Sequence, residues 1–231
     1  MGDMAGILTE SLKGMGAGAQ ALAAVVVVGG GGFGLWLVGD RLGNYSVDRE
    51  PAVCSVTEDV LPQEYVSGAQ LCTALNRPDL PELLGTPGDE TLSAGGQGRW
   101  GGLGRSAEIA ASEAKVSLTS YAVQLSAAYD QLPVGRSAEL LGPTAQKTTV
   151  LGHPSVLYSD RTIAISFGGG TTGSTHSGGI ARSLVVALDP KDGGGSYEVT
   201  IWRKDGTVPD DAALFRVAEQ VLPTVPGWTA G

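Results

Sequence analysis

Residues 196–222, with the sequence SYEVTIWRKDGTVPDDAALFRVAEQVL, place a strand directly before a helix. Tyr197, Val199 and Ile201 alternate with polar residues in the first part, and this period of two is typical of a strand with one buried face. The second part carries an apolar stripe with helical spacing, made of Leu214, Val217, Ala218 and Val221. A strand followed by such a helix favours a fold in which helices cover one face of a sheet.

The segments upstream extend the expected sheet. We expect two hairpins, one around a tight turn at residues 159–161 and one around the turn at 189–195. The alternation of residues 115–129 changes phase near Ser120, which indicates a bulge or a break there. The sequence therefore predicts an α+β domain built on an antiparallel sheet.

Helices are expected at both ends of this domain. Ser67 and Gln70 form a capping box for a helix that ends near Asn76, and residues 80–84 form a further helical turn. At the C-terminal end, we expect a helix from 209 to about 222, capped by residues 207–210. Two glycine-rich stretches, 85–106 and 168–179, are expected to be loops.

The N-terminal segment is strongly apolar. Residues 21–38, ALAAVVVVGGGGFGLWLV, contain no polar side chain, and eighteen helical residues span about 27 Å, close to the ~30 Å hydrocarbon core of a membrane. We expect a short cytoplasmic N-terminus at 1–16, a single transmembrane helix at 17–39, a tether at 40–50 and an extracytoplasmic α+β domain at 51–231. A cleaved signal peptide is the alternative, although no small-residue cleavage site follows the apolar run.

Cys54 and Cys72 are the only cysteines. Metal binding would need more ligands nearby, and a redox pair would have C-x-x-C spacing. Two interpretations stay open, a structural disulfide or two buried thiols. The membrane segment favours the disulfide, because disulfides persist outside the cytoplasm. The outward orientation of the domain depends on this pair, since Lys13 inside against Arg41 and Arg49 outside gives no positive-inside bias.

Charge excludes one class of partner. Residues 51–231 contain 12 Lys or Arg and 19 Asp or Glu, a net charge of -7. Such a surface repels phosphate backbones, so we expect no nucleic-acid binding.

Candidate catalytic residues are few. His153 lies between Gly152 and Pro154 and is expected to be a turn residue before a strand; as a general base it would need a carboxylate and a hydroxyl beside it. His176 lies in an expected loop, and its neighbour Ser177 lacks the G-x-S-x-G context. We therefore assign no catalytic, cofactor-binding or metal-binding residue.

Two further motifs are interpreted as ordinary surface features. Asp189 and Asp192 lack the spacing of a calcium loop and are expected to belong to a hairpin turn. The pair Arg99-Trp100 is a possible partner contact, but an exposed loop is the simpler interpretation.

Several segments resemble a known family. They are 19–28 (AQALAAVVVV), 67–72 (SGAQLC), 75–80 (LNRPDL), 84–87 (LGTP), 156–161 (VLYSDR) and 217–223 (VAEQVLP). Together they resemble an actinobacterial, streptomycete-type family of membrane-anchored proteins of unknown function. The resemblance implies membrane anchoring but no ligand or catalytic residue.

These observations lead to two hypotheses. The first is a non-enzymatic, membrane-anchored module of the cell envelope that binds an envelope protein or a cell-wall ligand. The alternative is an envelope-associated hydrolase whose site assembles only in three dimensions.

Overall fold

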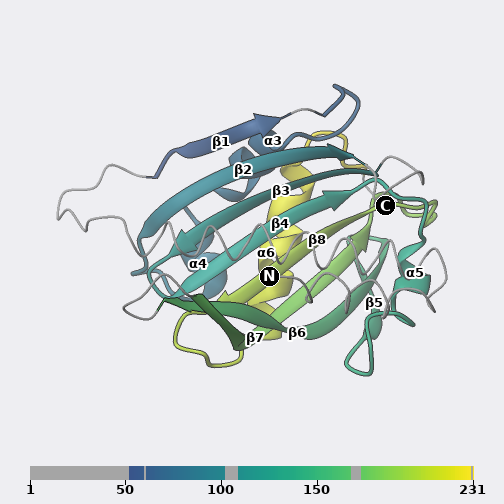
Figure 1. Cartoon of the computed structure of the whole chain (residues 1–231). Coiled ribbons are helices and arrows are strands. Elements are labelled where there is room, and N and C mark those ends of the chain that lie inside the picture. The colour runs from purple at the N-terminus through teal and green to yellow at the C-terminus, as the bar shows by residue number, and fades with distance from the viewer. Residues whose placement is uncertain (1–51, 60, 102–108, 168–172, 230) are drawn as a thin grey trace, which may run out of the picture. The chain divides into compact units, whose positions relative to one another are not determined.

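The computed structural model describes residues 52–59, 61–101, 109–167, 173–229 and 231. Their strands form one eight-stranded sheet in the order β1-β2-β3-β4-β8-β7-β6-β5 (Figure 1). The strands are β1 (Cys54–Asp59), β2 (Thr91–Gly101), β3 (Ile109–Leu118), β4 (Tyr121–Ala128), β5 (Gln146–Val150), β6 (His153–Phe167), β7 (Gly173–Ala187) and β8 (Ser196–Arg203).

Most of the helices cover one face of this sheet. The α-helices are α3 (Gly68–Leu75), α4 (Leu80–Leu84), α5 (Val134–Ser137) and α6 (Asp211–Val221), and a short 3-10 helix, η1 (Leu222–Thr224), follows α6. α3 packs on β1, β2 and β3, while α6 packs on β7 and β8 and contacts α4 (Figure 1). The prediction of an α+β fold is confirmed.

The prediction of a purely antiparallel sheet is wrong at one edge. β1 pairs with β2 in parallel, with Cys54 opposite Ala94, whereas the other strand pairs are antiparallel. A parallel neighbour requires a crossover connection, and here α3 and α4 lie between the two strands in the chain. The observed sheet is therefore mixed.

Half of the expected loop at residues 85–106 is a strand, β2, and residues 102–106 lie outside the described residues. The glycines of this strand serve close packing, because α3 lies directly on its backbone. A Cβ atom on Gly68 would overlap the backbone of Gln97, and a Cβ on Gly96 would overlap the backbone of Gly68. Sequence reasoning took these glycines as loop signals, but in a strand they also mark a close approach of another backbone.

The expected turn at residues 159–161 is also wrong, because β6 runs without interruption from His153 to Phe167. The turn was expected because Ser159, Asp160 and Arg161 separate two strand-like stretches. The pairing instead shifts register here, because Gly178 and Gly179 of β7 together face Thr162, so the bulge lies in β7. A Cβ on Gly178 would overlap Thr162, and the glycine-rich stretch, expected to be a loop, enters β7 from Gly173 onward.

Other predictions are confirmed. β3 and β4 separate at Ser120, β8 has its expected bounds, and the turn at 189–195 joins β7 to β8. Ser67 caps α3 through the predicted capping box with Gln70. α6 begins at Asp211, two residues after the expected start, and its cap is Asp210, the last of the four residues expected to cap it.

The main core lies between the sheet and the helices α3, α4 and α6. Alternate strand residues such as Val123, Val199 and Ile201 are fully buried there, as are Leu71 and Leu214 from the helices. A smaller cluster on the other face joins α5 to β6 and β7 through Val134, Val156, Tyr158, Val185 and Ala187.

The predicted transmembrane helix at 17–39 lies outside the described residues. Within the part of the chain that the structure describes, no helix is long and apolar enough to cross a membrane.

Candidate functional site

A groove of about 630 Å³ lies between α3 and the chain that follows α6. This volume is in the roughly 300–1,000 Å³ range of small-ligand sites. One wall of the groove is formed by α3, the other, the C-terminal wall, by the segment after α6, and residues 77–79 form the floor. The residues that line it are Ala69, Gln70, Thr73, Ala74, Arg77, Pro78, Asp79, Thr224 and Pro226. Sequence analysis did not detect this site, because its residues form no recognisable motif and come from opposite ends of the domain.

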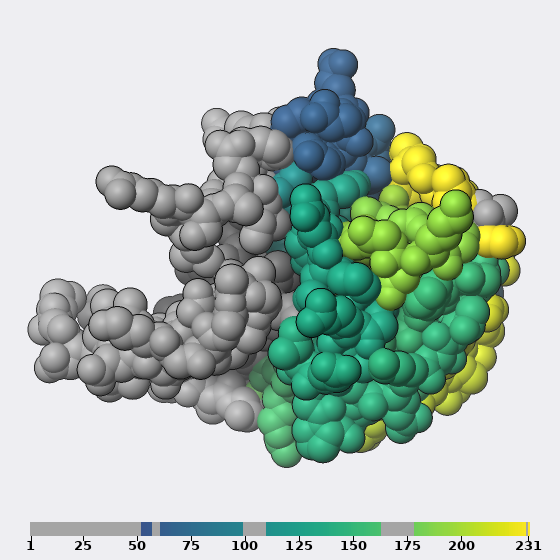
Figure 2. All heavy atoms as spheres, turned by 90° about the vertical axis from the view of Figure 1, so that its right-hand side faces the viewer, coloured from purple at the N-terminus to yellow at the C-terminus, as the bar shows by residue number. Residues whose placement is uncertain are grey.

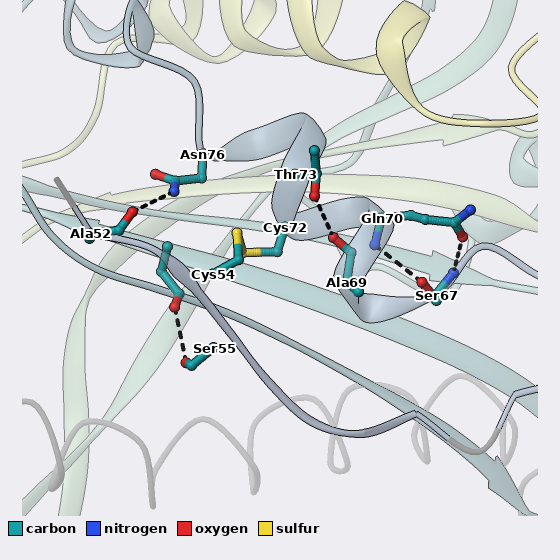
Figure 3. Close-up of a disulfide and its surroundings, with 10 residues drawn as sticks. Ala52, Cys54, Ser55, Ser67, Ala69, Gln70, Cys72, Thr73 and Asn76 are labelled. Carbon is teal, nitrogen blue, oxygen red and sulfur yellow. Dashed lines mark hydrogen bonds between the residues drawn. A yellow bond between two sulfur atoms is a disulfide. The ribbon is translucent and has the colours of Figure 1, made fainter.

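The disulfide fixes the α3 wall. Cys54 and Cys72 are bonded, with their Cα atoms 6.0 Å apart, so the predicted bridge is present (Figure 3). Asn76 Nδ2 donates to the Ala52 carbonyl at 2.7 Å, and Ser55 Oγ donates to the Ala94 carbonyl at 3.1 Å. The disulfide and the Asn76 bond thus join the first strand and the residues before it to α3, and the Ser55 bond joins this strand to β2.

The C-terminal wall, residues 222–229, is held by a buried histidine. The Trp228 ring stacks on the His153 ring with centroids 4.2 Å apart. His153 Nδ1 lies 2.8 Å from the Ala187 carbonyl, and Nε2 lies 2.8 Å from the Thr229 carbonyl. Val225 is buried in the main core. This wall is therefore held in two ways, by the buried apolar side chain of Val225 and by the contacts of the His153 ring.

This geometry also decides the role of His153. The residue begins β6 directly after the turn at Leu151 and Gly152, close to the predicted position. Its ring is fully buried, and both nitrogens face backbone carbonyls rather than the carboxylate and hydroxyl that a general base requires. His153 is a structural residue, and the hydrolase alternative loses its candidate base.

The floor of the groove carries an ion pair. Arg77 Nη2 donates to Asp79 Oδ2 at 2.8 Å, and Nη1 donates to the Gln220 carbonyl at 2.7 Å. The hydrogen bond from Arg77 lowers the pKa of the Asp79 carboxyl, which therefore remains ionised at neutral pH. The Asp79 side chain is 46% exposed and the Arg77 side chain 23%.

The opposite face of the sheet carries a polar row that runs across five strands. Residues directly opposite each other in register are Lys115, Gln124, Thr200, Ser183 and Tyr158. Lys115, Ser183 and Tyr158 are buried. Lys115 Nζ lies 5.1 Å from the centre of the Trp202 ring, a cation–π distance.

Glu198 lies beside this row. Tyr158 donates its hydroxyl proton to Glu198 Oε1 at 2.5 Å, and Ser183 and Thr200 share a hydrogen bond of 2.8 Å. Burial raises the pKa of the Glu198 carboxyl, and burial together with that carboxyl raises the pKa of Tyr158 well above its usual value. Tyr158, Glu198, Ser183 and Thr200 thus bond to one another. This part of the row is a structural network, and the groove is the better candidate for binding.

The aspartates of the 189–195 turn bind backbone amides. Asp189 accepts from the amides of Lys191 and Gly193, whereas Asp192 accepts from the amides of Val134 and Gly135 at 2.6 and 2.8 Å. Figure 2 shows this turn, in light green, against the segment that carries α5, in teal. The turn prediction is confirmed, and the link to α5 was not foreseen.

The remaining candidates are not brought together. Arg99-Trp100 lies in β2 and His176 in β7, so neither is in a loop; their side chains lie outside the described part. Among the described residues, no three His, Cys, Asp or Glu side chains are grouped as metal ligands.

The comparisons with known proteins support one part of the expected resemblance, namely that the chain belongs to a family of unknown function. No curated protein and no solved structure matches the chain. The model of a family of unknown function, DUF6215, matches residues 12–144, which is more than half of the chain and includes α3 and the floor of the groove. This chain therefore belongs to the DUF6215 family of unknown function.

Proposed function

We propose that this protein is a membrane-anchored binding module of the actinobacterial cell envelope, with the domain outside the membrane and the groove between α3 and the C-terminal wall as its binding site. The observation that carries the proposal is the Cys54–Cys72 disulfide, which joins the first strand to α3, the helix that forms one wall of the groove. A disulfide between residues so close to the expected membrane segment suits an oxidising compartment. The apolar run at 21–38 supplies the anchor.

The groove supports binding rather than catalysis. Both of its walls are fixed, one by the Cys54–Cys72 bridge and the other by the stacking of Trp228 on His153. Fixed walls reduce the entropy that is lost when a ligand binds. The groups that line the groove include an ion pair and two threonines but no activated nucleophile.

Site-specific photo-crosslinking in the native host tests binding. A photoreactive amino acid is placed in the full-length chain at Thr73 in the groove or at Thr149, an exposed threonine on β5. We expect crosslinks from position 73 that are absent from position 149 and disappear when Ala69→Arg fills the groove. Equal crosslinking from both positions, or none from position 73, would contradict the proposal.

Membrane washing tests the anchor. The full-length chain should stay in the membrane pellet after a carbonate wash, with the N-terminal sequence intact. Recovery of a soluble chain that begins near Asp40 would show a cleaved signal peptide and would refute anchoring by this segment.

A further inference from the structure

The polar atoms of the groove define what a ligand must offer. Thr73 Oγ1 donates its proton to the Ala69 carbonyl at 2.9 Å, and Thr224 Oγ1 donates to the Val221 carbonyl at 2.7 Å. Since each hydroxyl has one proton, both oxygens can only accept further hydrogen bonds. The two walls of the groove thus each present an acceptor.

Gln70 presents the complementary group. Its Oε1 accepts from the Ser67 amide at 2.8 Å, and Figure 3 shows the amide nitrogen turned away from that contact. Gln70 therefore retains donor capacity. A ligand that offers two N–H donors and one carbonyl matches this set, and an extended peptide backbone carries such groups at regular intervals.

The apolar part of the lining separates peptides from sugars. Ala69, Ala74, Pro78 and Pro226 supply small, flat apolar surface, and no aromatic ring lines the groove. Planar aromatic faces are what a sugar ring or a base would stack on. A peptide with small or proline side chains fits this lining without them.

The charges near the groove indicate which sign of charge the ligand should carry. On the floor, the Asp79 side chain is 46% exposed, so its carboxylate can be reached by a ligand although it is paired with Arg77, whose side chain is 23% exposed. The surrounding domain, residues 51–231, has a net charge of -7. A ligand that places a cationic group next to Asp79 is therefore favoured over one that places an anionic group there.

We propose that the groove binds an extended basic peptide segment of a protein partner. Its backbone N–H groups donate to Thr73 and Thr224, its carbonyl accepts from Gln70, and a lysine or arginine side chain reaches Asp79. This inference rests on the proposed binding function, and it names the ligand class.

A fluorescent octapeptide of alanine and proline with one central lysine tests the inference, with glutamate or norleucine at the same position as comparisons. Binding to the full-length protein in detergent is measured by fluorescence anisotropy. We expect the lysine peptide to bind about 2- to 5-fold more tightly than the norleucine peptide, as for a partly exposed ion pair, and the glutamate peptide to bind most weakly.

Substitutions test which groove residues contact the peptide. Asp79→Asn should abolish the preference for lysine, whereas Glu139→Gln, which removes the same charge beyond α5, should preserve it. The double variant T73V/T224V should weaken binding of all three peptides about tenfold through the loss of two acceptors. Because Asp79→Asn also breaks the pair with Arg77, the salt dependence of lysine-peptide binding to the unchanged protein gives a second measurement. A preference for lysine should fall as salt rises.

The outcomes separate the two proposals. Equal or tighter binding of the glutamate peptide, or a lysine preference that survives Asp79→Asn, would overturn the basic-peptide inference. Absence of binding by all three peptides would also overturn it. In either case the binding function stands if the groove-dependent crosslinks at position 73 are found, and falls if they are not.

Discussion

The two faces of the sheet differ in the side chains at their centre, although the same strands form both. On the face under α3, α4 and α6, Val123, Val199 and Ile201 are completely buried in apolar contacts. On the other face, the neighbouring residues Gln124 and Thr200 belong to a hydrogen-bonded polar row. The comparison teaches that one face holds the helices in place and so shapes the groove, while on the other face polar side chains such as Tyr158 and Glu198 bond to one another.

Adjacent residues on β8 provide the largest expected contrast. Ile201→Ala should lower the free energy of unfolding by about 2–5 kcal/mol, because it leaves a cavity under the helices. Thr200→Ala, one position along on the polar face, should cost about 1 kcal/mol through lost hydrogen bonds. Equilibrium unfolding in urea measures both. Similar losses for the two variants would break the comparison.

The next effect concerns the contact between α3 and β2. Gly68→Ala should lower the free energy of unfolding by about 3 kcal/mol, even though alanine is the better helix former, because the new Cβ would overlap the backbone of Gln97. Gly88→Ala is the matched control, since nothing lies within 4 Å of a Cβ at that position. A variant at position 68 as stable as this control would show that the helix is not in direct contact with the strand.

Sequence patterns predicted the helix-covered face better than the rest of the sheet. The alternation of Tyr197, Val199 and Ile201 and the capping box at Ser67 are local signals, and both were interpreted correctly. The polar residues Ser159, Asp160 and Arg161 were mistaken for a turn, because polar residues between two apolar stretches can also lie within one long strand.

Two other features depend on partners distant in the chain, and sequence analysis missed both. The glycines of β2 looked like a loop until α3 was placed on them. The groove likewise joins α3 to Thr224 and Pro226, about 150 positions away in sequence, and no local periodicity encodes that proximity. Only the disulfide, inferred from the cysteine count and the membrane segment, indicated which segment would support the site.

The polar face should show the smallest effect, and it should depend on pH. Because burial raises the folded-state pKa of Glu198, the contribution of this group to stability is fully present below the ordinary carboxyl pKa and is lost as pH rises through the raised value. Glu198→Gln cannot ionise and can still accept from Tyr158. We therefore expect a higher melting temperature than that of the natural protein at about pH 7 and little difference at about pH 4. A difference that stays constant over this range would contradict the assignment.

The central claim is that a disulfide-linked domain lies outside the membrane, and thiol counting tests it most directly. The protein is isolated from its native host, denatured without reductant in the presence of an alkylating reagent, and weighed by mass spectrometry. We predict no added alkyl group, and two after reduction, because Cys54 and Cys72 are the only cysteines and are bonded to each other. Two alkyl groups without reduction would indicate a reducing compartment and contradict the outward orientation.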